Sequence, residues 1–151
     1  MVTQKSVIDE FMALQSLAVV GVSRNKDKFG NMVYRELKTN GYKVFAVNPQ
    51  ADMIDGDRCY AGLGALPEVP EGVILVIPSA QGVSVVEEMA RLGIKHLWIQ
   101  QGAESPELEK RSQELGLSFV RGECIFMFIE PVKSIHSVHR FIKRLFGKYP
   151  K

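Results

Sequence analysis

The stretch with the clearest chemical potential is LAVVGVSRNKDKFGN, residues 17–31. An apolar run ends at Gly21, and the loop that follows carries Ser23, Arg24 and Lys26. A buried strand that ends at a small residue and passes into a helix is where open α/β sheets bind nucleotide phosphates, because backbone N–H groups and cations meet there. The stretch therefore predicts a phosphate-binding loop. A solvated surface loop is the alternative explanation of the same cations.

The same stretch lacks the glycine spacing of a dinucleotide site. A dinucleotide fingerprint needs G-x-G-x-x-G, in which closely spaced glycines let the backbone approach a diphosphate. Here no glycine follows Gly21 until Gly30. A second apolar run ends in VNPQ, so Asn48 stands where an NAD site carries a carboxylate for the ribose hydroxyls. Both features disfavour NAD, whereas Arg24 and Lys26 favour a ligand with more phosphate charge.

The apolar pattern predicts the elements that must position this loop. Short runs rich in β-branched and aromatic residues, typical of buried parallel strands, occupy residues 17–22, 43–48, 72–78, 96–102 and 117–122. Helical spacing with start and stop signals covers residues 31–39, 81–91 and 105–116. A shorter strand is expected at 58–60, with a helical turn after it. This order predicts an α/β fold: a Rossmann-like, doubly wound, mostly parallel sheet with helices on both faces and ligands at the carboxyl ends of the strands.

Length and composition are those of a single globular domain over residues 1–151. No apolar run approaches the roughly 20 residues that span a bilayer, so we expect no transmembrane segment. Acidic Asp9 and Glu10 stand where a signal peptide needs an apolar segment, which predicts a cytoplasmic protein. Cys59 and Cys124 are far apart and form no C-x-x-C, which argues against a disulfide framework or a zinc site.

Positive charge is concentrated at the end of the chain. Six lysines and arginines and no acidic residue follow Pro131, so the net charge of +2 becomes about −4 for the residues before them. That body is not suited to nucleic acid, and we expect no nucleic-acid partner. Apolar residues at helical intervals predict a basic amphipathic helix over 131–151. Such a helix either packs on the sheet or docks on a protein partner or an anionic surface.

Four motifs follow one another along residues 7–131, and their order is informative. They read AVVGVSRNKDKFGNMVYRELKTNGYKVFAVNP, CYAGLGALPEVPEGVILVIPS, LWIQQGAE and GLSFVRGEC. This layout resembles that of the small stand-alone CoA-binding proteins, which are related to the CoA-binding domain of the succinyl-CoA synthetase α subunit. The resemblance implies a Rossmann-like domain that binds CoA or acyl-CoA across the ends of its strands.

The resemblance also implies where each part of a CoA molecule would lie. The diphosphate would lie at Gly21, Val22 and Ser23. Arg24 and Lys26 would approach the outer phosphates, the 3′-phosphate included. The adenosine would lie near Val47, Asn48 and Pro49.

The pantetheine arm would run along two further strand ends. By resemblance it would pass Ile77, Pro78 and Ser79, and then Gln100, Gln101 and Gly102. A strand end with a proline lacks one backbone donor, so it suits an alkyl-amide arm better than a phosphate. Cys124 follows the last predicted strand at the same edge, where a CoA thiol could exchange into a mixed disulfide. A buried structural cysteine is the alternative.

The sequence offers no catalytic constellation. Ser23 and Ser79 have no recognisable general-base partner, and His136 and His139 have no third metal ligand. A ligase of the resembled kind would need a second domain and a nucleotide-binding partner, which we do not expect here. We predict non-catalytic binding of CoA or acyl-CoA by a carrier, sensor or regulatory module. Two alternatives stay open: an NAD(P)-binding or redox-sensing Rossmann protein, and a protein-interaction module with a vestigial nucleotide site.

Overall fold

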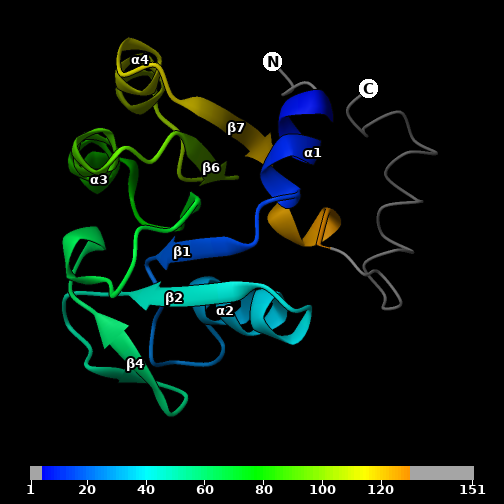
Figure 1. The fold of residues 1–151 in the computed structure, drawn as a ribbon, viewed down its shortest axis with the longest axis vertical. Coiled ribbons are helices and arrows are strands. Elements are labelled where there is room, and N and C mark those ends of the chain that lie inside the picture. Colours follow the sequence, from blue (N-terminus) through cyan, green and yellow to red (C-terminus); the bar gives the residue numbers. More distant parts are fainter. Residues whose placement is uncertain (1–4, 130–151) are drawn as a thin grey trace.

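A seven-stranded sheet flanked by helices forms the body of the computed structural model, which describes residues 5–129 (Figure 1). In chain order the strands are β1 (Ser16–Val20), β2 (Lys43–Val47), β3 (Met53–Ile54), β4 (Asp57–Tyr60), β5 (Gly72–Leu75), β6 (His96–Gln100) and β7 (Ser118–Glu123). Their spatial order is β3-β4-β2-β1-β5-β6-β7. Each neighbouring pair is parallel except β3 with β4. The predicted doubly wound, Rossmann-like architecture is confirmed.

The helices cover both faces of this sheet. They are α1 (Lys5–Met12), α2 (Phe29–Thr39), α3 (Ser79–Leu92) and α4 (Pro106–Glu114). On one face, α1 and α2 share a hydrophobic cluster with the 3-10 turn η2 (Ile125–Met127). On the other face, α3 and α4 share a second cluster with the 3-10 turn η1 (Leu63–Ala65). The predicted amphipathic helix over 131–151 lies outside the described residues.

The strands nearest the predicted site end earlier than the apolar runs suggest. β1 ends at Val20 because Gly21 has φ +111°, which extended backbone does not adopt. β5 ends at Leu75, and Pro78 then caps α3, whose first residue is Ser79. The expected short strand and helical turn are present as β4 and η1, while α1 and β3 were not predicted.

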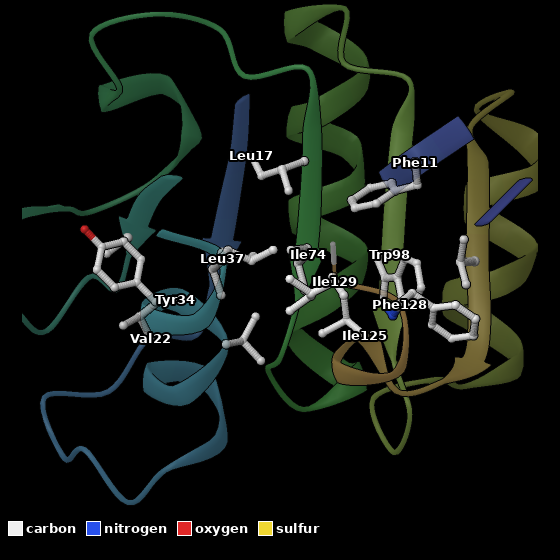
Figure 2. Close-up of a cluster of buried hydrophobic side chains, with 14 of the residues drawn as sticks. Phe11, Leu17, Val22, Tyr34, Leu37, Ile74, Trp98, Ile125, Phe128 and Ile129 are labelled. Carbon is white, nitrogen blue, oxygen red and sulfur yellow. The ribbon is translucent and has the colours of Figure 1, made fainter. Parts of the chain in front are cut away.

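Trp98 lies between Phe11 and Phe128 in the first hydrophobic cluster (Figure 2). It is fully buried, with its ring centroid 5.4 Å from that of Phe11 in α1 and 5.7 Å from that of Phe128. Its indole Nε1–H donates to the carbonyl oxygen of Glu123 at 3.3 Å, so the polar atom of the ring is satisfied. One side chain therefore joins α1, β6 and the end of β7, and this face of the sheet is filled.

A hairpin at the sheet edge is attached to α2 through a carboxylate. β3 and β4 are joined by Asp55-Gly56, both with positive φ, as a two-residue hairpin turn requires. Asp57 accepts hydrogen bonds from the Tyr34 hydroxyl at 2.8 Å and from the Lys38 ammonium. These two donors lower the pKa of Asp57, the Lys38 bond most, while burial and Asp57 raise the pKa of Tyr34.

We expect the contribution of Asp57 to depend on pH. Because its pKa is lowered by folding, the stability it contributes is present above the unfolded pKa of about 4 and is lost as the pH falls through the folded value. Asp57→Asn should cost about 1 kcal/mol at pH 7, a modest value for a partly exposed pair. Urea unfolding from pH 7 to pH 2.5 measures this, with Asp52→Asn on the exposed turn as control. If the difference in unfolding free energy between the parent chain and Asp57→Asn does not shrink at low pH, the effect comes from packing and not from the charge of Asp57.

Candidate functional site

Gly21 forms the turn at the carboxyl end of β1. Its N–H donates to the Val47 carbonyl oxygen at 3.0 Å, which joins this turn to β2. A Cβ at position 21 would lie 2.8 Å from Ile77 Cγ2 and 3.0 Å from the Val76 carbonyl oxygen. The turn therefore lies against the segment after β5, and with φ +111° only glycine fits without strain. Three strand ends meet at this residue.

Gly30 makes the complementary close approach from α2. A Cβ at position 30 would lie 2.3 Å from the Gly21 carbonyl oxygen and 3.3 Å from Val22 Cα. Side chains cannot tolerate such distances to backbone atoms, so the first turn of α2 packs directly on the β1 turn. Gly21 and Gly30 are too far apart in the sequence for the dinucleotide pattern. In the structure they nevertheless bring the backbone of α2 against the backbone of the β1 turn.

The loop between these glycines is held by side chains of α2. Fully buried Asn31 donates from Nδ2 to the Ser23 carbonyl oxygen at 2.7 Å. Arg35 donates from Nε to Asn31 Oδ1 at 2.8 Å and from Nη2 to the Lys26 carbonyl oxygen at 2.9 Å. Inside the loop, Ser23 Oγ accepts from the Asn25 N–H at 3.0 Å. The loop is thus ordered by its own chain before any ligand is bound.

The N–H groups of Val22 and Ser23 have no hydrogen-bond partner within residues 5–129. They follow directly on the Gly21 turn, where a phosphate oxygen could accept from both. The Ser23 hydroxyl oxygen already accepts one hydrogen bond, so its proton is available for donation. Val22 and Ser23 are two of the three residues predicted for the diphosphate, whereas the N–H of the third, Gly21, is bonded to Val47.

Asn48 connects the end of β2 to the same loop. Its Nδ2 donates to the Val22 carbonyl oxygen at 2.9 Å, and its Oδ1 accepts from the Gln50 N–H at 2.9 Å. Its own N–H donates to the Tyr60 carbonyl oxygen at 2.9 Å. The side-chain amide therefore holds two turns in register, a role that the sequence reading, which placed Asn48 beside adenosine, did not include.

A cavity of about 660 Å³ opens at these strand ends, on the face of the sheet that α3 covers. Its walls are the β1 turn at 20–23, the end of β2 at 47–50, the segment 61–63 after β4, Ile77, and one side of α3. This volume is within the range of small-molecule binding sites. Six of the predicted residues line it: Gly21, Ser23, Val47, Asn48, Pro49 and Ile77.

Glu88 lines the cavity from α3 and is hydrogen-bonded to the opposite wall. Its Oε1 accepts from the Leu63 N–H at 3.1 Å, and the Leu63 side chain is buried in the second cluster. The segment after β4 is therefore held to α3 by this hydrogen bond and by the hydrophobic cluster that Leu63 shares with the helix. Sequence reasoning missed Glu88, Gln81, Ser84 and Arg91, which all line the cavity; their spacing along one helix face was the available signal.

The other predicted residues of the β1 loop lie outside the cavity lining. The Val22 side chain is fully buried in the first cluster, so only its backbone faces the strand ends (Figure 2). Arg24 is exposed. Lys26 is also exposed, with its Nζ 4.0 Å from Asp55 Oδ1 on the β3–β4 turn.

The residues predicted for the far side of the pantetheine path are separated from the cavity as well. Gln100 is buried, and its Oε1 accepts from the Ile125 N–H at 3.1 Å, which assigns its side chain to the support of η2. The Gln101 N–H donates to the Glu123 carbonyl oxygen at 3.3 Å, and the Gly102 N–H donates to Glu104 Oε1 at 3.0 Å. Pro78 is exposed at the start of α3, which begins with Ser79.

The two cysteines differ in surroundings. Cys59 is buried in β4, and burial raises the pKa of its thiol. Cys124 is half-buried at the start of η2 and is not among the cavity-lining residues. Both are free thiols, and exchange of Cys124 with a CoA thiol stays a prediction.

Metal-ligating clusters and membrane-spanning helices are both absent from residues 5–129. No group of three His, Cys, Asp or Glu side chains in this part of the chain is placed to hold a metal ion. No helix there has both the length and the apolar character that crossing a membrane requires.

Comparison with known proteins identifies the family. Residues 15–130 match the family described as CoA binding domain. This range includes all seven strands and the whole cavity. The chain belongs to the CoA binding domain family.

Its relatives include both long enzymes and short chains. Acetate-CoA ligase (ADP-forming) II of Archaeoglobus fulgidus is 33% identical over 109 residues, which are 67% of this chain and 16% of the ligase. The uncharacterized protein YneT of Bacillus subtilis is 28% identical over 109 residues, 72% of this chain and 81% of YneT. The solved structure of a conserved hypothetical protein from Pyrococcus furiosus is 36% identical, with a TM-score of 0.70, and the match covers 74% of this chain and 96% of that one. The chain thus spans less than a fifth of the ligase.

The contact between the two glycines generates a prediction. Gly30→Ala should destabilise the fold by about 1–3 kcal/mol, because the new methyl group overlaps the Gly21 carbonyl oxygen and backbone must move. Gly64→Ala is the matched control, since a Cβ there lies 3.7 Å from Glu88 Oε2, an ordinary contact. Guanidinium unfolding compares the two variants. Equal stability of Gly30→Ala and the parent chain would show that the approach is not tight.

Proposed function

We propose that this chain binds CoA or an acyl-CoA non-covalently in the cavity at the carboxyl ends of β1, β2, β4 and β5. The observation that carries the proposal is the cavity itself, which lies within the residues that match the CoA binding domain family and is lined by the turn that follows β1. Open α/β sheets bind nucleotides at the point where strand order reverses, here between β1 and β5.

The β1 turn suits the diphosphate of CoA. Two unpartnered N–H groups, those of Val22 and Ser23, and the Ser23 hydroxyl can donate to phosphate oxygens. No aspartate or glutamate lies in the first turn of α2, which begins beside Gly21. The partial positive charge at the helix start therefore adds to the attraction.

The remaining walls suit the other parts of the molecule. Pro49 after β2 and Leu63 at the start of η1 line the cavity with apolar atoms, which suits the adenine ring. Ile77 and Val85 offer apolar surface on the α3 side, which suits the pantetheine arm. In this proposal the arm leaves the cavity past Pro78, in the direction of Gly102.

The role we propose is that of a carrier, sensor or regulatory module. The long ligase relatives contain this domain as a small part of their length, whereas the match to YneT covers 81% of that protein. The proposal therefore assigns ligand binding to these residues and no reaction step.

A second candidate ligand is an NAD(P) cofactor. The observation in its favour is Glu88, whose carboxylate lines the cavity and could accept from ribose hydroxyls, although no carboxylate follows β2. The absence of closely spaced glycines and the presence of Asn48 argue against it. Direct comparison of the two cofactors decides between them.

We expect CoA to raise the melting temperature and NADH to leave it unchanged. A ligand that binds only the folded state stabilises it by about 2.7 kcal/mol at 100 times its Kd. Thermal unfolding with acetyl-CoA, CoA, NADH and no ligand measures this. A shift with NADH and none with CoA would contradict the proposal.

A variant pair locates the ligand in the same experiment. Ser84 lines the cavity and its side chain is exposed, so Ser84→Glu should fold and should oppose an anionic ligand. Gln113→Glu adds the same charge to the exposed surface of α4, outside the cavity. CoA should stabilise the Gln113 variant as it does the parent and should lose most of its effect on the Ser84 variant.

A further inference from the structure

One face of α3 forms a wall of the cavity along most of the helix. Gln81, Ser84, Glu88 and Arg91 line it, at intervals of three and four residues. Ten residues of α-helix from 81 to 91 rise about 15 Å. The lining of the cavity therefore includes both the β1 turn and residues near the end of α3.

Among residues 5–129, Arg91 is the only basic residue that lines this cavity. It is exposed and has no acidic side chain within 4.0 Å among residues 5–129. Glu88, one helical turn before it, instead accepts from the Leu63 N–H. The neighbouring helix shows the contrast, because Arg111 of α4 pairs with both Glu87 and Glu114. The Arg91 guanidinium is left available to a ligand.

We infer that Arg91 binds the 3′-phosphate of the adenosine and so distinguishes CoA from ligands that lack this group. The inference rests on the proposed function, which assigns the diphosphate to the β1 turn and the adenosine to the strand ends at 47–50 and 61–63. With the diphosphate assigned, the 3′-phosphate is the one charged group of CoA that still lacks a binding residue. It is a phosphomonoester on the far side of the ribose. A guanidinium can bind two of its oxygens at once.

This assignment differs from the expectation drawn from the sequence, which gave the 3′-phosphate to Arg24 and Lys26. Neither residue lines the cavity, and Lys26 has Asp55 nearby. Glu88 strengthens the distinction, because its fixed carboxylate repels a phosphate from the middle of the α3 wall. The phosphate is thereby favoured at the Arg91 end.

Calorimetric titration of CoA and dephospho-CoA tests the inference on the parent chain and on four variants. Arg91→Met removes the charge and keeps most of the side-chain stem, and Arg91→Lys keeps the charge without the bidentate geometry. Arg24→Met tests the expectation from the sequence. Lys95→Met removes an exposed positive charge close to the end of α3 but outside the cavity. This variant controls for the effect of net charge on the binding of an anionic ligand.

We expect the parent chain to prefer CoA over dephospho-CoA by about tenfold, the value of one charge-assisted contact. Arg91→Met should lose that preference with less than a twofold change for dephospho-CoA, and Arg91→Lys should keep part of it. Arg24→Met and Lys95→Met should keep it in full. The inference is overturned if Arg91→Met still prefers CoA over dephospho-CoA. It is also overturned if Arg24→Met, and not Arg91→Met, loses this preference.

Failure of the proposed function gives a different result. If the parent chain binds neither CoA nor dephospho-CoA, the proposed function is wrong and the inference with it. If the parent chain binds both equally well, CoA binding stands and the role of Arg91 is wrong. Melting temperatures of all variants, measured in the same buffer, separate lost recognition from lost folding.

Discussion

The close approach of Gly30 to the carbonyl oxygen of Gly21 is the contact on which the site depends. It brings the first turn of α2 onto the end of β1, and it leaves the intervening loop no route except over the edge of the sheet. Asn31 and Arg35 then hold that loop through its carbonyl oxygens. The N–H groups of Val22 and Ser23 have no partner within residues 5–129 and stay free for a ligand, because these two helix side chains bind carbonyl oxygens of the loop and not its N–H groups.

The sheet divides the molecule into a filled face and an open one. On the side of α1 and η2, Trp98 and its aromatic neighbours occupy the space up to the strand ends. On the side of α3, the segment after β4 is tied to the helix by Glu88 and Leu63, and the space between this segment and the β1 turn is the cavity. The proposed ligand site is thus confined to one face, although strand ends from both halves of the sheet contribute to its lining.

Sequence reasoning was sufficient for the fold class, and it named the residues at strand ends that line the candidate cavity at positions 21, 23, 47–49 and 77. Apolar runs predict buried strands whatever their neighbours, and the order of elements then determines the topology. The β3–β4 hairpin was missed although Asp55-Gly56 is a strong turn signal, because the two-residue β3 carries too little pattern. Gln100 could have been assigned to the filled face, since it lies two residues after Trp98. The spacing of Glu88 and Arg91 places them on one face of a helix, but their part in the cavity did not follow from it, because which helix face meets the cavity depends on packing across the sheet.

The central claim is that CoA binds in the cavity between the β1 turn and α3. Amide chemical shifts of isotope-labelled protein, followed by NMR during titration with CoA, test it most directly. The account predicts changes concentrated at residues 20–23, 47–50 and 61–63 and along the α3 wall. Changes confined to residues 100–104 and 124–127, with the cavity residues unmoved, would contradict it.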